Sequence, residues 1–157
     1  MTALIEIDSV SGSLQGGTSG PRDIALLSAA EWHAHPARQT QGLLLGVDAE
    51  PDERFLAAPL IGIEFPAFHD GRGLSLAVLL RSRLGYAGEL RAVGDVQPDL
   101  IHYYRRCGFD SFVLPKGRSV APGSAILAPY SDYYQASVRN PRPLFRRNRG
   151  GVHQRDR

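Results

Sequence analysis

The chain has few sulfur-containing residues and no long apolar run, and each shortage excludes a class of protein. Its single cysteine, Cys107, cannot form an internal disulfide, so we expect a reducing compartment and therefore a cytoplasmic protein. The longest apolar runs, such as 43–45 and 76–80, are far shorter than the roughly 20 residues of a membrane span, so no membrane contact is expected. The opening MTALIEIDSV has no basic leader before an apolar stretch, which argues against a secretion signal.

Acidic residues are scarce at the C-terminal end. Residues 139–157 contain seven arginines and one aspartate, whereas the preceding residues carry 15 acidic and 11 basic side chains. With Pro141 and Pro143 also present, this composition predicts a disordered Arg-rich tail over 139–157. Nucleic acids and acidic protein surfaces are the usual binding partners of such a tail. Because the body is acidic and Phe145 is the only aromatic residue in the tail, we favour a solvated tail and do not expect nucleic-acid binding.

The size and composition of the chain fit one globular domain with a single core. It has 157 residues, of which 43% are hydrophobic and 22% are charged. Residues 9–21 are rich in glycine and serine, so residues 1–21 are expected to form a flexible N-terminal lead-in. The α/β domain is then predicted over residues 22–138.

Apolar residues recur at strand and helix spacing through this domain. Short apolar runs predict buried strands at 42–47, 60–65, 90–93 and 112–114. Residues 23–27 fit a short strand or a turn. Helices are predicted between these segments, at 28–35, 52–59, 76–84 and 98–106. Strands alternating with helices are typical of a mostly parallel sheet. We therefore predict an α/β fold of four or five strands, either an open sheet or a partial β/α barrel.

Local signals mark the ends of these helices. Ser28 and Glu31 have the spacing of a capping box, and Ser75 suits the N-cap of the third helix. Gly85 and Gly108 suit the left-handed residue that follows a helix.

Two loops follow neighbouring strands of the predicted sheet. The first contains Asp70, Gly71, Arg72 and Gly73 before a helix, and the second contains Gly94 and Asp95. In open parallel sheets, ligands bind in the crevice beyond the carboxyl ends of the strands, so this edge is the candidate site. Glycines that merely allow a tight turn, with Asp70 as a cap, are the alternative interpretation, because the loop lacks a dinucleotide or Walker pattern.

Charged residues near these loops suggest two kinds of chemistry. Asp70 and Asp95 are candidate catalytic carboxylates that would act as acid and base or hold a metal, although aspartates at such places more often cap a helix or pair with arginine. An oxyanion such as sulfite or phosphate would be bound by the loop glycines and by arginine donors. The candidate anion-binding residues are Gly71, Gly73, Arg72, Arg91, Arg105 and Arg106.

Metal and thiol chemistry find little support. The histidines are dispersed, no metal site is predicted from them, and the sequence leaves the cofactor unknown. Cys107 follows Arg105 and Arg106, whose charges would favour a thiolate, but it lies in the last turn of a predicted helix, where the dipole disfavours one. We therefore interpret Cys107 as a packing residue.

Several motifs of this region occur together in one known family. They are Phe65-Pro66, the Asp70–Gly73 turn with Ser75, the run GELRAVGDV at 88–96, the run RCGFD at 106–110 and Tyr134-Gln135. Over about residues 22–138 the chain resembles the "domain of unknown function" family numbered 934, whose members are small bacterial proteins sometimes labelled probable oxidoreductases. Leu100 departs from the pattern, because family members commonly carry an amide residue there.

The resemblance implies a biological setting. Members of this family are typically encoded beside sulfite reductase and other genes of assimilatory sulfate reduction. We therefore expect an accessory protein of sulfite reduction that binds sulfite reductase or another sulfate-assimilation enzyme, or else an anion. The alternative is a small enzyme, with an Asp/Arg crevice that binds an anion.

Overall fold

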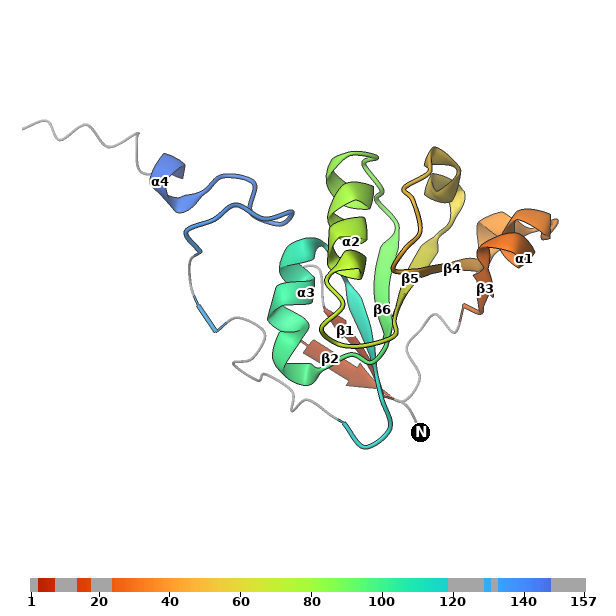
Figure 1. Cartoon of the computed structure of the whole chain (residues 1–157), viewed down its shortest axis with the longest axis horizontal. Helices are drawn as coiled ribbons and strands as arrows, with labels where there is room; N and C mark the ends of the chain where they lie inside the picture. The colour runs from red at the N-terminus through yellow and green to blue at the C-terminus, as the bar shows by residue number, and fades with distance from the viewer. Residues whose placement is uncertain (1–2, 8–13, 18–23, 119–128, 131–132, 148–157) are drawn as a thin grey trace, which may run out of the picture.

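The computed structural model describes residues 3–7, 14–17, 24–118, 129–130 and 133–147 of the 157-residue chain. Its centre is a seven-stranded sheet with the order β2-β1-β7-β6-β5-β4-β3 (Figure 1). Among the described residues, no helix is long and apolar enough to cross a bilayer.

Five consecutive strands of the sheet run parallel to one another. They are β3 (Leu26–Ser28), β4 (Gly42–Gly46), β5 (Leu60–Phe65), β6 (Glu89–Gly94) and β7 (Ser111–Leu114). This confirms the predicted α/β class and its mostly parallel sheet. The strand order ends at β2 on one side and β3 on the other, so the described strands form an open sheet, one of the two predicted arrangements.

Two further strands extend the sheet at its β7 edge. β1 (Ala3–Ile7) pairs antiparallel with β7, and β2 (Leu14–Gly17) pairs antiparallel with β1. They fall within residues 1–21, where a flexible lead-in was expected, and the remaining residues of that segment lie outside the described ones. The physical reason for the difference is that an edge strand such as β7 presents unpaired N–H and C=O groups, which an extended segment satisfies whatever its side chains.

The helices follow most of the predicted positions. They are α1 (Ala29–Ala34), α2 (Arg72–Ser82), α3 (Ile101–Cys107) and α4 (Leu144–Arg147), with 3-10 turns η1 (Arg38–Thr40), η2 (Glu53–Ala57) and η3 (Pro98–Leu100). The capping box of Ser28 and Glu31 is confirmed, as are the positive φ angles of Gly85 (70°) and Gly108 (112°). Ser75 is not an N-cap, because α2 begins one turn earlier, after Gly71.

The helices pack against one face of the sheet. From β3 to β7 the spatial order of the strands equals their order in the chain, and crossovers of one hand then place the connecting helices α1, α2 and α3 on the same side. α2 and α3 lie over this face of the sheet (Figure 1). Ile61, Leu90 and Phe112 are fully buried in a core that also includes Trp32 of α1. Their sequence neighbours in β5, β6 and β7 alternate to the opposite face.

Candidate functional site

The loops after β5 and β6 meet at the carboxyl rim, the edge of the sheet where these two strands end. One oxygen of the Asp95 carboxylate accepts a hydrogen bond from the backbone N–H of Phe68 at 3.1 Å. The other oxygen accepts from Gln97 Nε2 at 3.2 Å and from Arg118 Nη1 at 3.1 Å. The predicted meeting of the two loops is confirmed, and Asp95 is the residue that joins them.

Gly94 allows this close approach. Its φ of 91° lies in the left-handed region, and a Cβ added there would lie 2.3 Å from the carbonyl oxygen of Phe65. The chain thereby turns directly onto the end of β5, where the N–H of Asp95 donates to the Phe65 carbonyl at 2.9 Å. Only glycine fits this backbone without strain.

Asp70 is engaged by its own neighbour. Arg72 donates to both carboxylate oxygens, from Nε at 3.0 Å and from Nη2 at 2.7 Å, and its backbone N–H donates to the first of them. The hydrogen bonds from the Arg72 side chain hold the pKa of Asp70 below its usual value. Asp70 is therefore a carboxylate at neutral pH, and the Arg72 side chain is 63% exposed.

Of the two glycines of this loop, only Gly73 is required by the packing of α2. Gly71 is the N-cap, with an ordinary φ of −68° and open space around it. Gly73 is buried, and a Cβ there would lie 2.6 Å from the ring of Phe65. A glycine at this place lets the first turn of α2 lie directly on β5, whereas the N-cap is Gly71 and not, as the turn interpretation predicted, Asp70.

The carboxyl rim differs from the ligand crevice of doubly wound folds. Such a crevice opens where the strand order reverses, so that neighbouring loops part to opposite faces. From β3 to β7 the described strands keep one order, so the loops after β5 and β6 turn to the same face and bond to each other. Among the described contacts, none joins the carboxylates of Asp70 and Asp95.

Arg91 lies on the sheet face opposite the helices. It is in register with Gly62 of β5 and Ser111 of β7. Its guanidinium donates to Glu89 Oε1 at 2.7 Å and to Ser111 Oγ at 3.1 Å, and Ser111 Oγ donates to the same Glu89 oxygen. Arg91 is 6% exposed and thus forms a buried polar cluster away from the carboxyl rim.

Arg105 and Arg106 lie at the other end of the domain. They are in the last turn of α3, close to the edge where β6 and β7 begin. Burial lowers the pKa of Arg105 from its usual value, and the nearby charge of Arg139 adds to this effect. The structure therefore does not gather the predicted anion-binding arginines: Arg72 lies at one end of α2 and β5, Arg91 within the sheet, and this pair at the opposite end.

An arginine that the sequence analysis left out organises this opposite edge. Arg81, at the end of α2, donates to the carbonyls of Tyr86 at 2.6 Å, Gly88 at 2.8 Å and Gly108 at 3.0 Å. It also forms an ion pair with Asp110, whose carboxylate accepts from the N–H of Leu90 at 2.9 Å. One side chain thus ties the ends of α2 and α3 to the start of β6.

The C-terminal strap, residues 133–141, is fastened to the same edge. Arg139 donates to Asp110 Oδ1 at 2.7 Å and to the Phe109 carbonyl at 3.0 Å. The N–H of Val138 donates to the carbonyl of Arg106 at 3.2 Å, and the guanidinium of Arg106 lies 4.0 Å from the ring centre of Tyr133. The expected disordered tail therefore begins with a docked residue and contains α4, while residues 148–157 lie outside the described ones.

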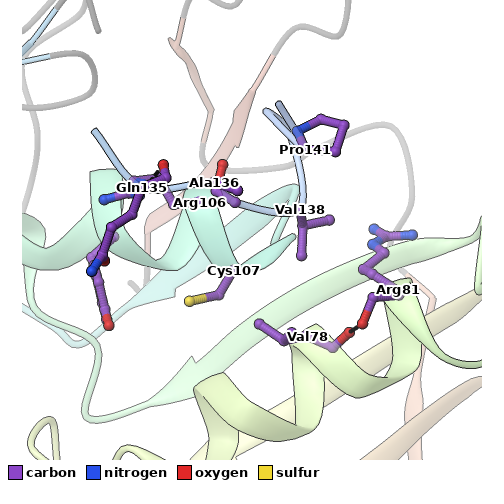
Figure 2. A pocket seen from close by; sticks show the side chains of 11 residues that line it. Val78, Arg81, Arg106, Cys107, Gln135, Ala136, Val138 and Pro141 are labelled. Atoms are coloured by element: carbon purple, nitrogen blue, oxygen red, sulfur yellow. Dashed lines mark hydrogen bonds between the residues drawn. The ribbon is translucent and has the colours of Figure 1, made fainter. Parts of the chain in front are cut away.

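A groove of about 560 Å³ lies between α2, α3 and the C-terminal strap (Figure 2). Val78, Arg81 and Ser82 line it from α2, and Tyr103, Arg106 and Cys107 line it from α3. Gln135, Ala136, Ser137, Val138 and Pro141 close its third side. Its volume is in the range of ligand-binding pockets, and its position was not predicted.

Cys107 lies at this groove and also packs against the core. Burial raises the pKa of its thiol, and the charge of Arg106 only partly offsets the effect. The interpretation of Cys107 as a packing residue is confirmed. Figure 2 shows Cys107 on the side of α3 that faces α2.

Comparison with known proteins places the chain in a family. The family described as "bacterial protein of unknown function (DUF934)" matches residues 45–145. The chain belongs to this family. No curated protein and no solved structure matches it. Among the described residues of this DUF934 protein, no group of three or more His, Cys, Asp or Glu side chains is arranged to hold a metal ion.

The motifs that carry the family resemblance come together in two places. Asp70–Gly73 and Gly94-Asp95 form the carboxyl rim, whereas Arg106, Cys107 and Gln135 line the groove. The sequence pointed to the two loops of the carboxyl rim as the site, because each loop follows a predicted strand. The RCGFD and Tyr134-Gln135 motifs were the signal for the second place, but their 24-residue separation gave no indication that they touch.

Proposed function

We propose that this DUF934 protein acts by binding another protein, as a cytoplasmic accessory of assimilatory sulfite reduction. The observation that supports this most is the state of the carboxyl rim. Each oxygen of Asp95 already accepts from protein donors, and both oxygens of Asp70 accept from Arg72. The charged groups of the rim therefore hold the fold together and leave little for a substrate.

Acid–base catalysis would require a different arrangement. A general acid or base works best with a pKa near the working pH and within reach of the reacting atom. The pKa of Asp70 is instead lowered by its hydrogen bonds with Arg72, so that this carboxyl remains ionised at neutral pH. Arg72 points largely into solvent, and the other proposed anion donors lie elsewhere.

A thiol-based redox role is also poorly supported. A reactive thiol needs a lowered pKa, whereas burial raises the pKa of Cys107. Cys107 is also the only cysteine, so no second thiol in the chain is available to resolve a disulfide. We therefore favour binding over the small-enzyme alternative.

The sulfur-assimilation setting comes from the family resemblance. Members are typically encoded beside sulfite reductase, and the chain belongs to the same family over residues 45–145. Sulfite reductase or a neighbouring sulfate-assimilation enzyme is accordingly the proposed partner.

Affinity capture tests this proposal. The tagged full-length chain is expressed in host cells grown with sulfate as sole sulfur source, and captured proteins are identified by mass spectrometry. We expect a sulfate-assimilation enzyme to be enriched over an untagged control, and Asp70→Asn to capture it equally well. Failure to enrich any such enzyme would refute the proposed partner. Loss of capture with a folded Asp70→Asn variant would indicate that the partner binds at the carboxyl rim.

A further inference from the structure

We infer that the groove between α2, α3 and the C-terminal strap is the partner-docking site, and that its occupant is an acidic peptide segment with an apolar anchoring side chain. This inference rests on the proposed function, because it names the surface through which the protein would bind. It goes further by stating the chemistry that the partner must present.

The lining of the groove suits an apolar anchor. Val78 and Val138 face the space from opposite sides, with Cys107 at its base (Figure 2). Tyr103 forms part of the wall and is 46% exposed, which is high for a large aromatic residue. Apolar and aromatic groups that surround a concave space are the usual pocket for an anchoring side chain at a protein interface.

The charge around the groove indicates which residues should lie on either side of the anchoring side chain. Neither α2, α3 nor residues 133–147 contain an aspartate or glutamate, whereas they contain seven arginines besides Arg72, which lies at the far end of α2. Both charged residues that line the groove, Arg81 and Arg106, are arginines. Carboxylates on either side of the anchor would complement this field and raise the association rate.

The nearby acidic residue does not cancel this charge. Asp110 accepts from both Arg81 and Arg139, so one negative charge is shared between two positive ones. Within the described part of the chain, Arg106 donates to the Gln135 carbonyl and stacks on Tyr133 but has no carboxylate partner. The surface around the groove therefore keeps a net positive charge that an acidic segment can neutralise.

The walls of the groove are held in place before a partner arrives. The strap is fixed by the bond from the Val138 N–H to the Arg106 carbonyl at 3.2 Å and by the Arg139 ion pair at 2.7 Å. The other walls are helices packed on the core. A preformed site of this kind avoids part of the ordering cost of binding.

Two other occupants fit less well. The phosphates of a nucleic acid would match the arginines but would leave the apolar lining without a contact. The chain's own residues 148–157 contain three arginines and one aspartate, so their charge has the same sign as that of the groove. An acidic segment with one apolar anchor satisfies both the lining and the charge.

A pair of variants at one position tests the charge requirement. Ser82 is exposed at the end of α2 and lines the groove, so Ser82→Glu and Ser82→Lys differ mainly in the sign of the added charge. The probe is a synthetic peptide with one phenylalanine flanked by glutamates, titrated by calorimetry into the full-length protein. We expect Ser82→Glu to bind it about tenfold more weakly than Ser82→Lys, and binding to weaken as salt is added.

The single cysteine reports where the peptide binds. Thiol alkylation by iodoacetamide occurs only at Cys107, which lines the groove, so an occupant there must slow the reaction. Peptides with lysine in place of glutamate, or glycine in place of phenylalanine, serve as matched probes on the unmodified protein. We expect the glutamate–phenylalanine peptide alone to protect Cys107.

The outcomes separate this inference from the proposed function. Absence of binding by the glutamate–phenylalanine peptide, equal binding of the lysine peptide, or protection by an oligonucleotide in its place would overturn the inference. Capture of a sulfate-assimilation enzyme that is unaffected by Ser82→Glu would also overturn it, while leaving the function intact. Peptide binding with charge dependence but no captured sulfur enzyme would support the groove and refute the partner.

Discussion

The carboxylate of Asp95 accepts a hydrogen bond from the backbone N–H of Phe68 at 3.1 Å. This contact joins the loops that follow two adjacent parallel strands. It also assigns Asp95 a structural role, because a carboxylate that holds a loop in place cannot move freely to exchange protons with a substrate. The proposed binding function starts from this observation.

The first prediction concerns this brace. Asp95→Asn removes the charge that Arg118 and the Phe68 N–H stabilise, and we expect a loss of about 1–3 kcal/mol in the free energy of unfolding. Asp99→Asn is the matched control, since Asp99 is exposed on η3, and should change stability by no more than about 0.5 kcal/mol. Urea denaturation measures both. Equal stability of the two variants would show that the Asp95 contacts are not needed.

The second prediction concerns the turn before Asp95. Gly94→Ala places a Cβ 2.3 Å from the Phe65 carbonyl oxygen in a backbone with φ of 91°. We expect a cost of at least about 2 kcal/mol from strain and overpacking. Gly71→Ala, at the other loop, meets nothing within 4 Å and has a φ of −68°, so it should be neutral. The thermal unfolding midpoints of the two variants test this prediction. Equal midpoints would contradict it.

The third prediction concerns Arg81, whose side chain is 13% exposed. Arg81→Met removes the side-chain donor of three backbone carbonyls and leaves Asp110 with Arg139 as its one arginine partner, so we expect a loss of about 3 kcal/mol. Arg83→Met, two residues later and exposed, is the control and should remain close to the unmodified protein. Chemical denaturation of the two variants gives the comparison, and a stable Arg81→Met protein would exclude this role.

The fourth prediction concerns the pH dependence of Cys107. Its pKa is raised by burial, so the fold favours the neutral thiol; this contribution to stability is complete below the unfolded pKa and is lost as pH rises through the folded one. Alkylation by iodoacetamide should therefore be slower in the native protein than in guanidinium. The pH at which the alkylation rate rises should also be higher for the native protein than for the unfolded one. A native rate profile that lies at lower pH than the unfolded one would indicate an activated thiol.

The sequence predicted the parallel layer because its signals are local. The strand at 60–65 and the capping box of Ser28 and Glu31 follow from spacing and residue type alone, and both are confirmed. The start of α2 was misplaced because Ser75 is a better cap by type, whereas Gly71 is set by the packing of Gly73 on Phe65. That contact lies between elements and leaves no mark in local propensity.

The groove escaped prediction for a related reason. It depends on contacts between α3 and the strap, such as the one from Val138 to the Arg106 carbonyl, across 32 positions of sequence. The arginine content of the C-terminal end indicated a solvated tail, and nothing local indicated that Arg139 would pair with Asp110. The β1–β2 hairpin was missed in the same way, since glycine- and serine-rich composition outweighed its pairing with β7.

Growth of a host deletion strain on sulfate as sole sulfur source tests the central claim most directly, with plasmid-borne variants and with cysteine as the permissive control. The claim is that the protein acts by binding through the groove and not by catalysis at the carboxyl rim. It predicts that the deletion impairs growth on sulfate, that Asp70→Asn restores growth as well as the unmodified chain, and that Ser82→Glu does not, at equal protein levels. Restoration by Ser82→Glu together with failure of a folded Asp70→Asn protein, or a deletion strain that grows equally well on sulfate and cysteine, would contradict it.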